Sequence, residues 1–192
     1  MTHKTNSIIV GLTGQFGAGC STVADYLQEE GFRYYSLSDV VKASAQKRLG
    51  AFEYQKLSKK DLRGILQNEG NKLREGDTRA IAKKVHEQMK AAGHANEDIK
   101  ENIVVDSIRN PAEVEFFSAT FKRFFLLALD ASSEARWLRK QSDYEGNEEQ
   151  FKQDDMRDKG DEEPIHGQHT EACVYLSDVA IDNEQQLGYR QD

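Results

Sequence analysis

The chain has 192 residues and a formal net charge of −7, with 38% hydrophobic and 31% charged residues. This length suits one α/β domain with a substantial core and is short for two, so we expect a single domain over residues 1–192. The acidic balance, without a basic stripe, argues against a nucleic-acid polymer as partner. No apolar stretch approaches a membrane span and the two cysteines give no disulfide framework, so we expect a cytoplasmic protein without membrane contact.

A glycine-rich run follows the first predicted strand. Residues 8–12 form a short apolar run, typical of a buried parallel strand, and residues 14–21 read Gly-Gln-Phe-Gly-Ala-Gly-Cys-Ser. This matches the phosphate-binding loop G-x-x-x-x-G-K-[ST], except that Cys20 stands at the lysine position. Backbone N–H groups of such a loop and of the following helix can surround an anion. The predicted phosphate site consists of Gly14, Gln15, Phe16, Gly17, Ala18, Gly19, Cys20, Ser21 and Thr22. The alternative is a glycine-rich turn that binds no ligand.

Two residues of this loop bear on its chemistry. Ser21 stands where a hydroxyl would bind a magnesium ion, and Cys20 removes the cation that a phosphate-binding loop places on the β and γ phosphates. A neutral thiol cannot supply that charge, and a thiolate would repel a triphosphate. Either an arginine from elsewhere in the fold takes over, or turnover is weak or absent. The sequence therefore predicts nucleotide binding and leaves phosphoryl transfer open.

Strands and helices alternate along the rest of the chain. Apolar runs predict strands at residues 32–37, 102–106, 124–130 and 180–181. Caps and helical periodicity predict helices from residue 22, at 38–49 behind a Ser38–Asp39 cap, at 61–74, 78–89 and 111–117, and after Ser132 or Ser133, with a polar loop at 93–101. This alternation predicts an α/β fold of three layers, in which a parallel sheet carries helices on both faces.

A polar segment follows the last of these helices. Residues 141–168 include ten Asp or Glu, so we expect the segment to be exposed and mobile, either as a disordered loop or as a lid covering roughly residues 136–168. Arg136 and Arg139 lie three residues apart in a predicted helix and can face the same way. As catalytic residues on a lid they would supply the charge that Cys20 lacks, and the alternative is that they are surface charges.

Polar residues also follow two of the predicted strands. Asp106 ends an apolar run, as in a Walker-B element, where the carboxylate reaches the magnesium ion. Arg109, a candidate catalytic residue, comes soon after, at the strand edge where ligands bind in open α/β sheets, although a surface salt bridge would also explain it. Asp39 follows the second strand. It is a candidate for catalysis, through magnesium or an acceptor hydroxyl, and equally a helix N-cap.

The predicted helix at 61–74 carries a polar face at three- and four-residue spacings. A glycine inside that face costs roughly 1 kcal/mol relative to alanine, which indicates that another group approaches closely there. Amide and guanidinium groups suit the recognition of a base edge and a monophosphate, although polar helix faces are often simply solvated. The candidate substrate-binding residues are Asp39, Arg63, Gln67, Asn71, Arg74 and Arg109.

Taken together, these motifs resemble the nucleoside-monophosphate-kinase branch of the P-loop fold. The likeness is to dephospho-coenzyme A kinase-like and phage-type deoxynucleoside monophosphate kinase proteins, and to the kinase-like domain fused ahead of deoxycytidylate deaminases. It covers nearly the whole chain and rests on residues 14–22, 36–39, 66–74, 105–110 and 177–183. In the dephospho-coenzyme A kinase-like relatives the last element lies by the adenine, so the resemblance implies a base contact for Asn183.

The resemblance implies a kinase that uses ATP and Mg²⁺, with a nucleotide as its small-molecule acceptor. The alternative is a catalytically degenerate nucleotide-binding domain that senses nucleotide levels, and the deaminase-fused relatives also show the degenerate loop. Partners that the resemblance allows are a second copy of the chain and a fused or separate deaminase domain. His169-Thr-Glu171 spells H-x-E, but no P-C-x-x-C follows to complete a deaminase zinc motif. Either the chain stands alone or it is one domain of a longer protein.

Overall fold

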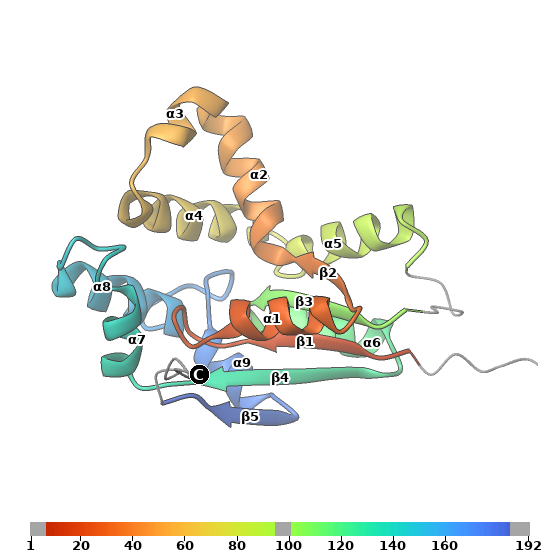
Figure 1. Cartoon of the computed structure of the whole chain (residues 1–192). Helices are drawn as coiled ribbons and strands as arrows, with labels where there is room; N and C mark the ends of the chain where they lie inside the picture. Colours follow the sequence, from red (N-terminus) through yellow and green to blue (C-terminus); the bar gives the residue numbers. More distant parts are fainter. Residues whose placement is uncertain (1–6, 95–100, 185–192) are drawn as a thin grey trace, which may run out of the picture.

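The computed structural model describes residues 7–94 and 101–184, so most of the polar loop expected at 93–101 lies outside the described residues. Its centre is a parallel sheet with the strand order β2-β3-β1-β4-β5. The strands are β1 (Ile9–Thr13), β2 (Arg33–Ser36), β3 (Ile103–Ile108), β4 (Phe124–Asp130) and β5 (Val179–Asp182). Parallel neighbours need crossover connections, which helices supply here (Figure 1). Among the described residues, none of the helices is both long and apolar enough to cross a membrane.

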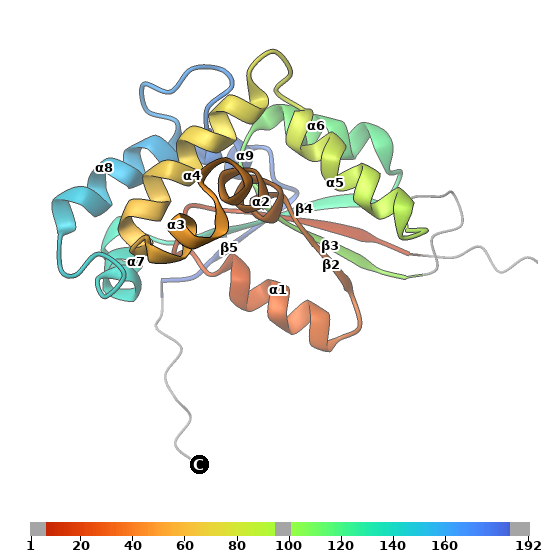
Figure 2. The same cartoon turned by 90° about the horizontal axis from the view of Figure 1, so that it is seen from above.

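Helices cover both faces of the sheet, so the predicted three-layer α/β fold is confirmed. One face packs against α1 (Cys20–Glu29), and the other packs against α2 (Leu37–Leu49), α5 (Ala80–Ala91), α6 (Pro111–Thr120) and α9 (Thr170–Tyr175) (Figure 2). The remaining helices lie beyond the carboxyl ends of the strands (Figure 1): α3 (Ala51–Lys56), α4 (Lys59–Arg74), α7 (Ser133–Lys140) and α8 (Glu148–Lys159).

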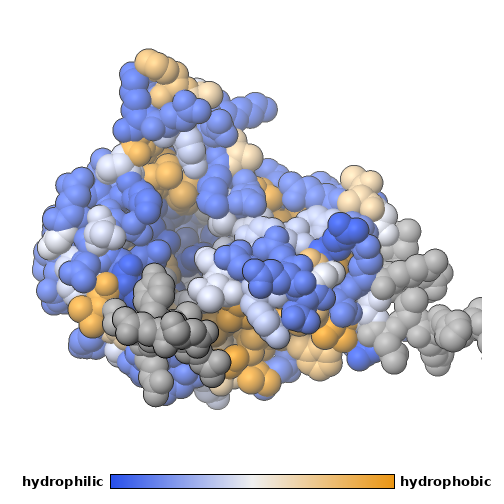
Figure 3. Space-filling model, in the orientation of Figure 1, coloured by the Kyte–Doolittle hydropathy of each residue, from blue (hydrophilic) through white to orange (hydrophobic). Residues whose placement is uncertain are grey.

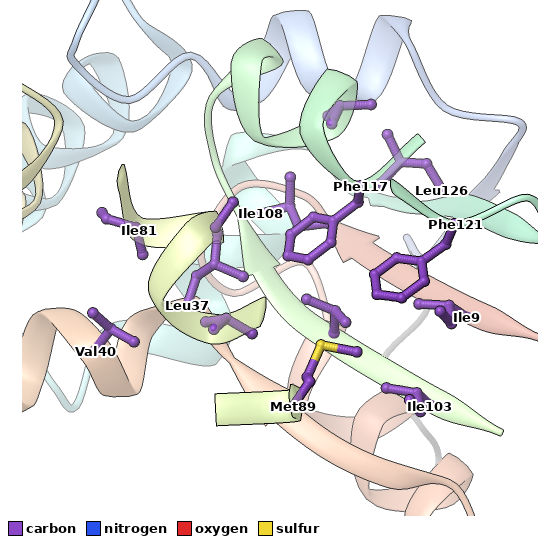
Figure 4. Close-up of a cluster of buried hydrophobic side chains, with 14 of the residues drawn as sticks. Ile9, Leu37, Val40, Ile81, Met89, Ile103, Ile108, Phe117, Phe121 and Leu126 are labelled. Atoms are coloured by element: carbon purple, nitrogen blue, oxygen red, sulfur yellow. The ribbon is translucent and has the colours of Figure 1, made fainter. Parts of the chain in front are cut away.

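Alternation along the strands divides the core between the two faces. Ile9, Ile103 and Leu126 point into the larger cluster, where they meet α5 and α6 (Figure 4). Leu12 and Leu129 point the opposite way, toward α1. Because successive strand residues face opposite sides, β1, β3 and β4 each contribute to both clusters, and near-continuous apolar runs result. This explains why the sequence predicts β4 with its observed bounds.

The start of α2 differs from the prediction. Its N-cap is Ser36, the last residue of β2, and not the Ser38–Asp39 pair. The chain passes from extended backbone at Ser36 directly into the helix, so Asp39 lies in the first turn. A carboxylate there is favourable because the helix dipole places partial positive charge at this end. The side chain of Asp39 is 60% exposed, and its partner is Lys42 at 2.9 Å.

The polar segment at 141–168 is also different from the prediction, because much of it is ordered against the body of the protein. It contains α8, in which Phe151, Asp154, Asp155 and Asp158 are buried. Phe151 packs its ring 5.1 Å from that of Phe16 and also contacts Trp137 and Tyr144. Buried carboxylates are tolerated where each has a partner, and these partners come from distant parts of the chain. Acidic composition alone could not reveal those pairs.

Asn110 connects α6 to the segment that follows α8. Its Oδ1 accepts a hydrogen bond from the backbone N–H of Ala112, while its Nδ2 donates to the carbonyls of Ile165 and Gly167, both at 2.9 Å. The carboxylate of Glu113 completes a capping box by accepting from the N–H of Asn110. One buried side chain thus caps a helix and pairs two carbonyls.

We therefore predict that Asn110→Ala lowers the free energy of unfolding by about 2–4 kcal/mol, measured by urea denaturation. The loss combines a helix cap, about 1 kcal/mol, with two carbonyls left without a donor. Asn147→Ala is the matched control, because Asn147 caps α8 with a single exposed hydrogen bond. We expect it to cost about 1 kcal/mol. Equal losses for the two variants would contradict the bridging role of Asn110.

Candidate functional site

The glycine-rich run forms the loop between β1 and α1. Gly14 and Gly19 have φ angles of +151° and +116°, which suit glycine. A Cβ on Gly14 would lie 2.3 Å from the carbonyl oxygen of Leu129, so a side chain cannot be accommodated there. Gly19 is the N-cap of α1, and in the described structure no side chain caps this helix. The first N–H groups of α1 therefore remain available to an anion.

This loop opens onto a cavity of about 520 Å³. Its walls come from α2, α4 and α7 and from the residues that follow β3, and Figure 3 shows the surface hollowed beneath the projecting α2–α4 region. Every residue of the predicted phosphate loop lines the cavity except Ala18, which is fully buried. Predicted residues beyond the loop that also line it are Arg63, Gln67, Arg74, Asp106, Arg109 and Arg139.

Unpartnered polar atoms gather around this cavity. In the described part of the chain, seven buried side-chain nitrogen or oxygen atoms have no hydrogen-bond partner, and six of them belong to residues that line it. Such atoms are rare in folded proteins because an unmade hydrogen bond costs about 1–3 kcal/mol. A polar ligand in the cavity would supply the missing partners. The six atoms are Gln15 Oε1, Arg63 Nε, Gln67 Oε1, Arg74 Nη1, Asp106 Oδ1 and Gln168 Oε1.

Asp106 has a carboxylate oxygen available to a ligand, and Ser21 lines the same cavity. Asp106 is buried, and its Oδ2 accepts hydrogen bonds from Tyr34 and Ser107 while its Oδ1 has no partner. Ser107 has a φ of +66°, an unusual backbone conformation of the kind that clusters at functional sites. Magnesium keeps several waters and takes only one or two protein ligands. The described residues contain no group of three or more His, Cys, Asp or Glu placed to hold a metal, which excludes an all-protein cage there.

Asp158 of α8 joins three separate parts of the site. Its Oδ2 accepts a hydrogen bond from the backbone N–H of Phe16 at 3.0 Å, and its Oδ1 pairs with Arg63 at 2.9 Å and with Arg109. The guanidinium of Arg63 also stacks 3.9 Å above the ring of Phe16. Burial lowers the pKa of Arg63. Burial also acts to lower the pKa of Arg109, but nearby charges, Asp158 first among them, outweigh it and raise that pKa. Two guanidinium groups thus share one carboxylate, which leaves a net positive charge beside the loop.

Cys20 is a neutral thiol. Its Sγ donates to the carbonyl of Thr13 at 3.4 Å, and burial, followed by the nearby carboxylate of Asp106, raises the pKa of the thiol to about 12. The start of a helix would favour a thiolate, but burial and a neighbouring anion outweigh that effect. Cys20 therefore neither supplies the missing cation nor adds a negative charge.

The two lid arginines lie in different places. Arg136 is 1% exposed and does not line the cavity, because its guanidinium pairs with Asp155 and donates to the carbonyl of Ala131. Arg139 does line the cavity and donates to the carbonyl of Gly17 at 3.0 Å. The structure therefore brings Arg139 and not Arg136 to the cavity, and Asp155 holds the charge of Arg136 inside the α7–α8 contact.

Three further predicted residues lie outside the cavity lining. Asp39 pairs with Lys42 at the surface, and Asn71 donates to Glu163 at 2.5 Å, which turns its side chain toward the segment after α8. Asn183 donates to the carbonyl of Ala18 at 2.8 Å and accepts from Arg139, so it contacts the loop from outside. Each of these side chains is directed away from the cavity by a partner of its own.

Several residues that line the cavity are not among the site residues predicted from the sequence. Lys140 packs against Gly17, and Lys42, Lys59, Tyr34 and Gln168 also contribute to the walls. Lys140 lies four residues after Arg136 in the same helix, so helical spacing offered a signal for it. No local signal marks the others, because they come from β2, α2, α4 and the segment after α8 and meet only when the chain folds.

The chain is similar to several known proteins. A family model described as AAA domain matches residues 10–163, so the chain belongs to the AAA-domain family. The UPF0200 protein of Methanothrix thermoacetophila is 32% identical over 131 residues, which is 68% of this chain and 63% of that protein. The UPF0200 protein of Pyrobaculum aerophilum is 28% identical over 134 residues, with the same two shares. The chain thus spans 63% of the length of these curated relatives.

A solved structure shares the fold. The crystal structure of TT1252 from Thermus thermophilus has a TM-score of 0.54 and 18% sequence identity, over 94% of this chain and 91% of that chain. At this identity the likeness concerns the fold alone. It agrees with the P-loop arrangement of parallel strands, glycine-rich loop and following helix described above.

We predict that Cys20 reacts slowly with iodoacetamide in the native protein. The pKa of the folded thiol, about 12, lies above the value of about 8.5 for an unfolded cysteine, so at pH 8.5 the native thiol keeps its proton. We expect alkylation at least about 100-fold slower than in the urea-unfolded chain, measured by mass spectrometry. Because the unfolded thiol loses its proton at a lower pH than the folded thiol, the free energy of unfolding falls as the pH rises above about 8.5. Rapid native labelling of Cys20 at pH 8.5 would show that a thiolate is present.

We also predict that Asp158→Asn lowers the free energy of unfolding by about 3 kcal/mol, because two buried guanidinium groups lose their shared counter-charge. Urea denaturation measures the effect. Asp161→Asn is the matched control, since Asp161 is exposed two residues beyond α8 and should change stability by no more than about 0.5 kcal/mol. A loss as small for Asp158→Asn as for the control would mean that the cluster contributes nothing to the fold.

Proposed function

We propose that this protein binds ATP with Mg²⁺ at the loop of residues 14–22 and transfers the γ-phosphoryl group to a nucleotide-like acceptor in the same cavity. The observation that carries the proposal is the gathering of six unpartnered buried polar atoms around a cavity that the loop itself lines. This would make the protein a nucleoside or deoxynucleoside monophosphate kinase-like phosphotransferase. The likeness of its motifs to dephospho-coenzyme A kinase-like proteins supports the same proposal.

The charges around the cavity support an anionic ligand. Among the described residues, seven basic and only two acidic side chains line it, although the chain as a whole carries a net charge of −7. Burial in such a concave site strengthens the field of these cations. The basic residues are Lys42, Lys59, Arg63, Arg74, Arg109, Arg139 and Lys140.

Each part of the cavity has a role in the proposed reaction. The N–H groups of the loop and of the first turn of α1 hold the phosphates of the donor. Ser21 and Asp106 would hold Mg²⁺, which neutralises phosphate charge when bound. Arg139 and Lys140, on α7 beside Gly17, supply the positive charge that Cys20 does not. Arg63 and Arg109 hold the phosphate of the acceptor, because their cluster with Asp158 is positive overall.

A second candidate function is nucleotide sensing without turnover. The neutral thiol of Cys20 favours it, since phosphoryl transfer depends on charge stabilisation at this position. In that case the same cavity binds a nucleotide, and the protein signals this binding to a partner, either a second copy of the chain or a deaminase domain.

Titration calorimetry with ATP and deoxynucleotides, paired with a phosphoryl-transfer assay, separates the two functions. Binding with turnover supports the kinase, binding alone supports the sensor, and absence of both rejects the site.

We predict that Cys20→Lys binds ATP about tenfold more tightly than the natural chain, because an ammonium group at this position donates to phosphate oxygens. Hydrogen bonds to charged groups contribute about 1.5–3 kcal/mol, which covers such a change. Cys20→Met is the matched control, since it is long but uncharged and should not tighten binding. Calorimetric titration of each variant with ATP and Mg²⁺ measures the difference. Equal affinity of the lysine and methionine variants would mean that the loop does not hold a triphosphate.

A further inference from the structure

We propose that the acceptor carries a nucleobase with an amino group beside an unprotonated ring nitrogen, and that Gln67 and Arg74 recognise this edge. Cytosine and adenine have such an edge. Uracil, thymine and hypoxanthine present the reverse pattern, a carbonyl beside a ring N–H. The proposal rests on the function proposed above, because it names the class of acceptor that this cavity selects.

Gln67 presents a hydrogen-bond acceptor to the cavity. Its side chain is buried, and its Nε2 donates to the backbone carbonyl of Asp154 at 3.0 Å. A carbonyl oxygen can only accept, so this bond fixes which end of the amide is nitrogen. The other end, Oε1, has no partner, and Gln67 lines the cavity. A ligand that satisfies it must offer an N–H or O–H group.

Arg74 presents an unpartnered donor in the same cavity. It is 2% exposed, its Nε donates to Glu113 at 2.8 Å, and its Nη1 has no partner. The guanidinium lies back along α4 over Gly70, where a Cβ would come within 3.2 Å of Nη1. Gly70 is three residues from Gln67, which is one helical turn. Arg74 Nη1 therefore lies over Gly70, one helical turn along α4 from the residue that carries the unpartnered acceptor, and Gln67, Gly70 and Arg74 all line the cavity.

The charge at this end of the cavity suits a neutral base and not a phosphate. The carboxylate of Glu113 is fully buried against Arg74, so the pair is balanced. At the other end, Arg63 and Arg109 share the single carboxylate of Asp158 and keep a net positive charge. A nucleotide lying along the cavity would place its phosphate at the positive end and its base at the balanced end.

The walls near Gln67 and Arg74 suit a flat ring. Leu37, Val41 and Leu66 line the cavity there, and the absence of a Cβ at Gly70 lets the guanidinium of Arg74 lie against α4 beside them. Apolar walls with a few fixed polar groups are typical of small-molecule sites. In such a site an amino group satisfies Gln67 Oε1 and a ring nitrogen satisfies Arg74 Nη1. A carbonyl in place of the amino group would leave two oxygens facing each other, and both protein atoms would stay unpaired.

Calorimetric titration of the natural chain with matched nucleotide pairs tests this inference. The pairs are CMP with UMP and AMP with IMP, which differ by amino against carbonyl at one ring position. We expect at least one amino-bearing nucleotide to bind about 10- to 100-fold more tightly than its carbonyl counterpart. Equal affinities within both pairs would overturn base recognition while leaving the proposed function standing. If no nucleoside monophosphate binds, the proposed acceptor and this inference both fail.

Substitution of the acceptor residue gives a second test. Gln67→Met keeps the length of the side chain and removes its oxygen, so the preference within each pair should fall to about threefold or less. Gln88→Met is the matched control, because Gln88 is exposed on α5 and does not line the cavity. It should leave the preference unchanged. A preference that survives Gln67→Met would assign recognition to other residues and overturn the role of Gln67.

Discussion

The carboxylate of Asp158 is the contact on which the rest of the site depends. It binds the backbone of the phosphate loop, Arg63 of α4 and Arg109 after β3, which are 142, 95 and 49 residues away in the sequence. Two arginines could not be buried together without it, because desolvated like charges repel. Asp158 therefore holds α8 over the loop and also offsets part of the positive charge of the two arginines.

The distribution of charge explains how a phosphate loop without its lysine can remain a site for anions. Here the positive charge comes from α4, α7 and the residues after β3, and not from the first residue of α1. The pair of Arg74 and Glu113 is balanced, whereas Arg63 and Arg109 exceed the charge of Asp158. In the proposed function, one end of the cavity would therefore bind phosphate and the other would select the base by hydrogen bonds.

The sequence predicted those parts of the structure that local patterns determine. The glycine loop and β4 each follow from residues within one short segment. The predicted strand that carries Asp106 is also present, but β3 continues beyond it to Ile108. It failed where a distant partner decides the outcome: Asp155 buries Arg136, Glu163 turns Asn71, and three aspartates of α8 are inside the protein. Composition counted those aspartates as solvent-exposed charges, since the arginines that pair with Asp155 and Asp158 lie outside their segment and nothing local reveals the bond between Asp154 and Tyr144.

The phosphate loop is held in place residue by residue from outside. Asp158 accepts from the N–H of Phe16, Arg139 donates to the carbonyl of Gly17, and Asn183 donates to the carbonyl of Ala18. These contacts come from α8, from α7 and from the end of β5, so no ligand is needed to shape the backbone. Binding to a preorganised loop loses less conformational freedom than binding to a mobile one. This preorganisation offsets part of the attraction lost with the lysine, and it gives Asn183 a role in the site without contact with the cavity.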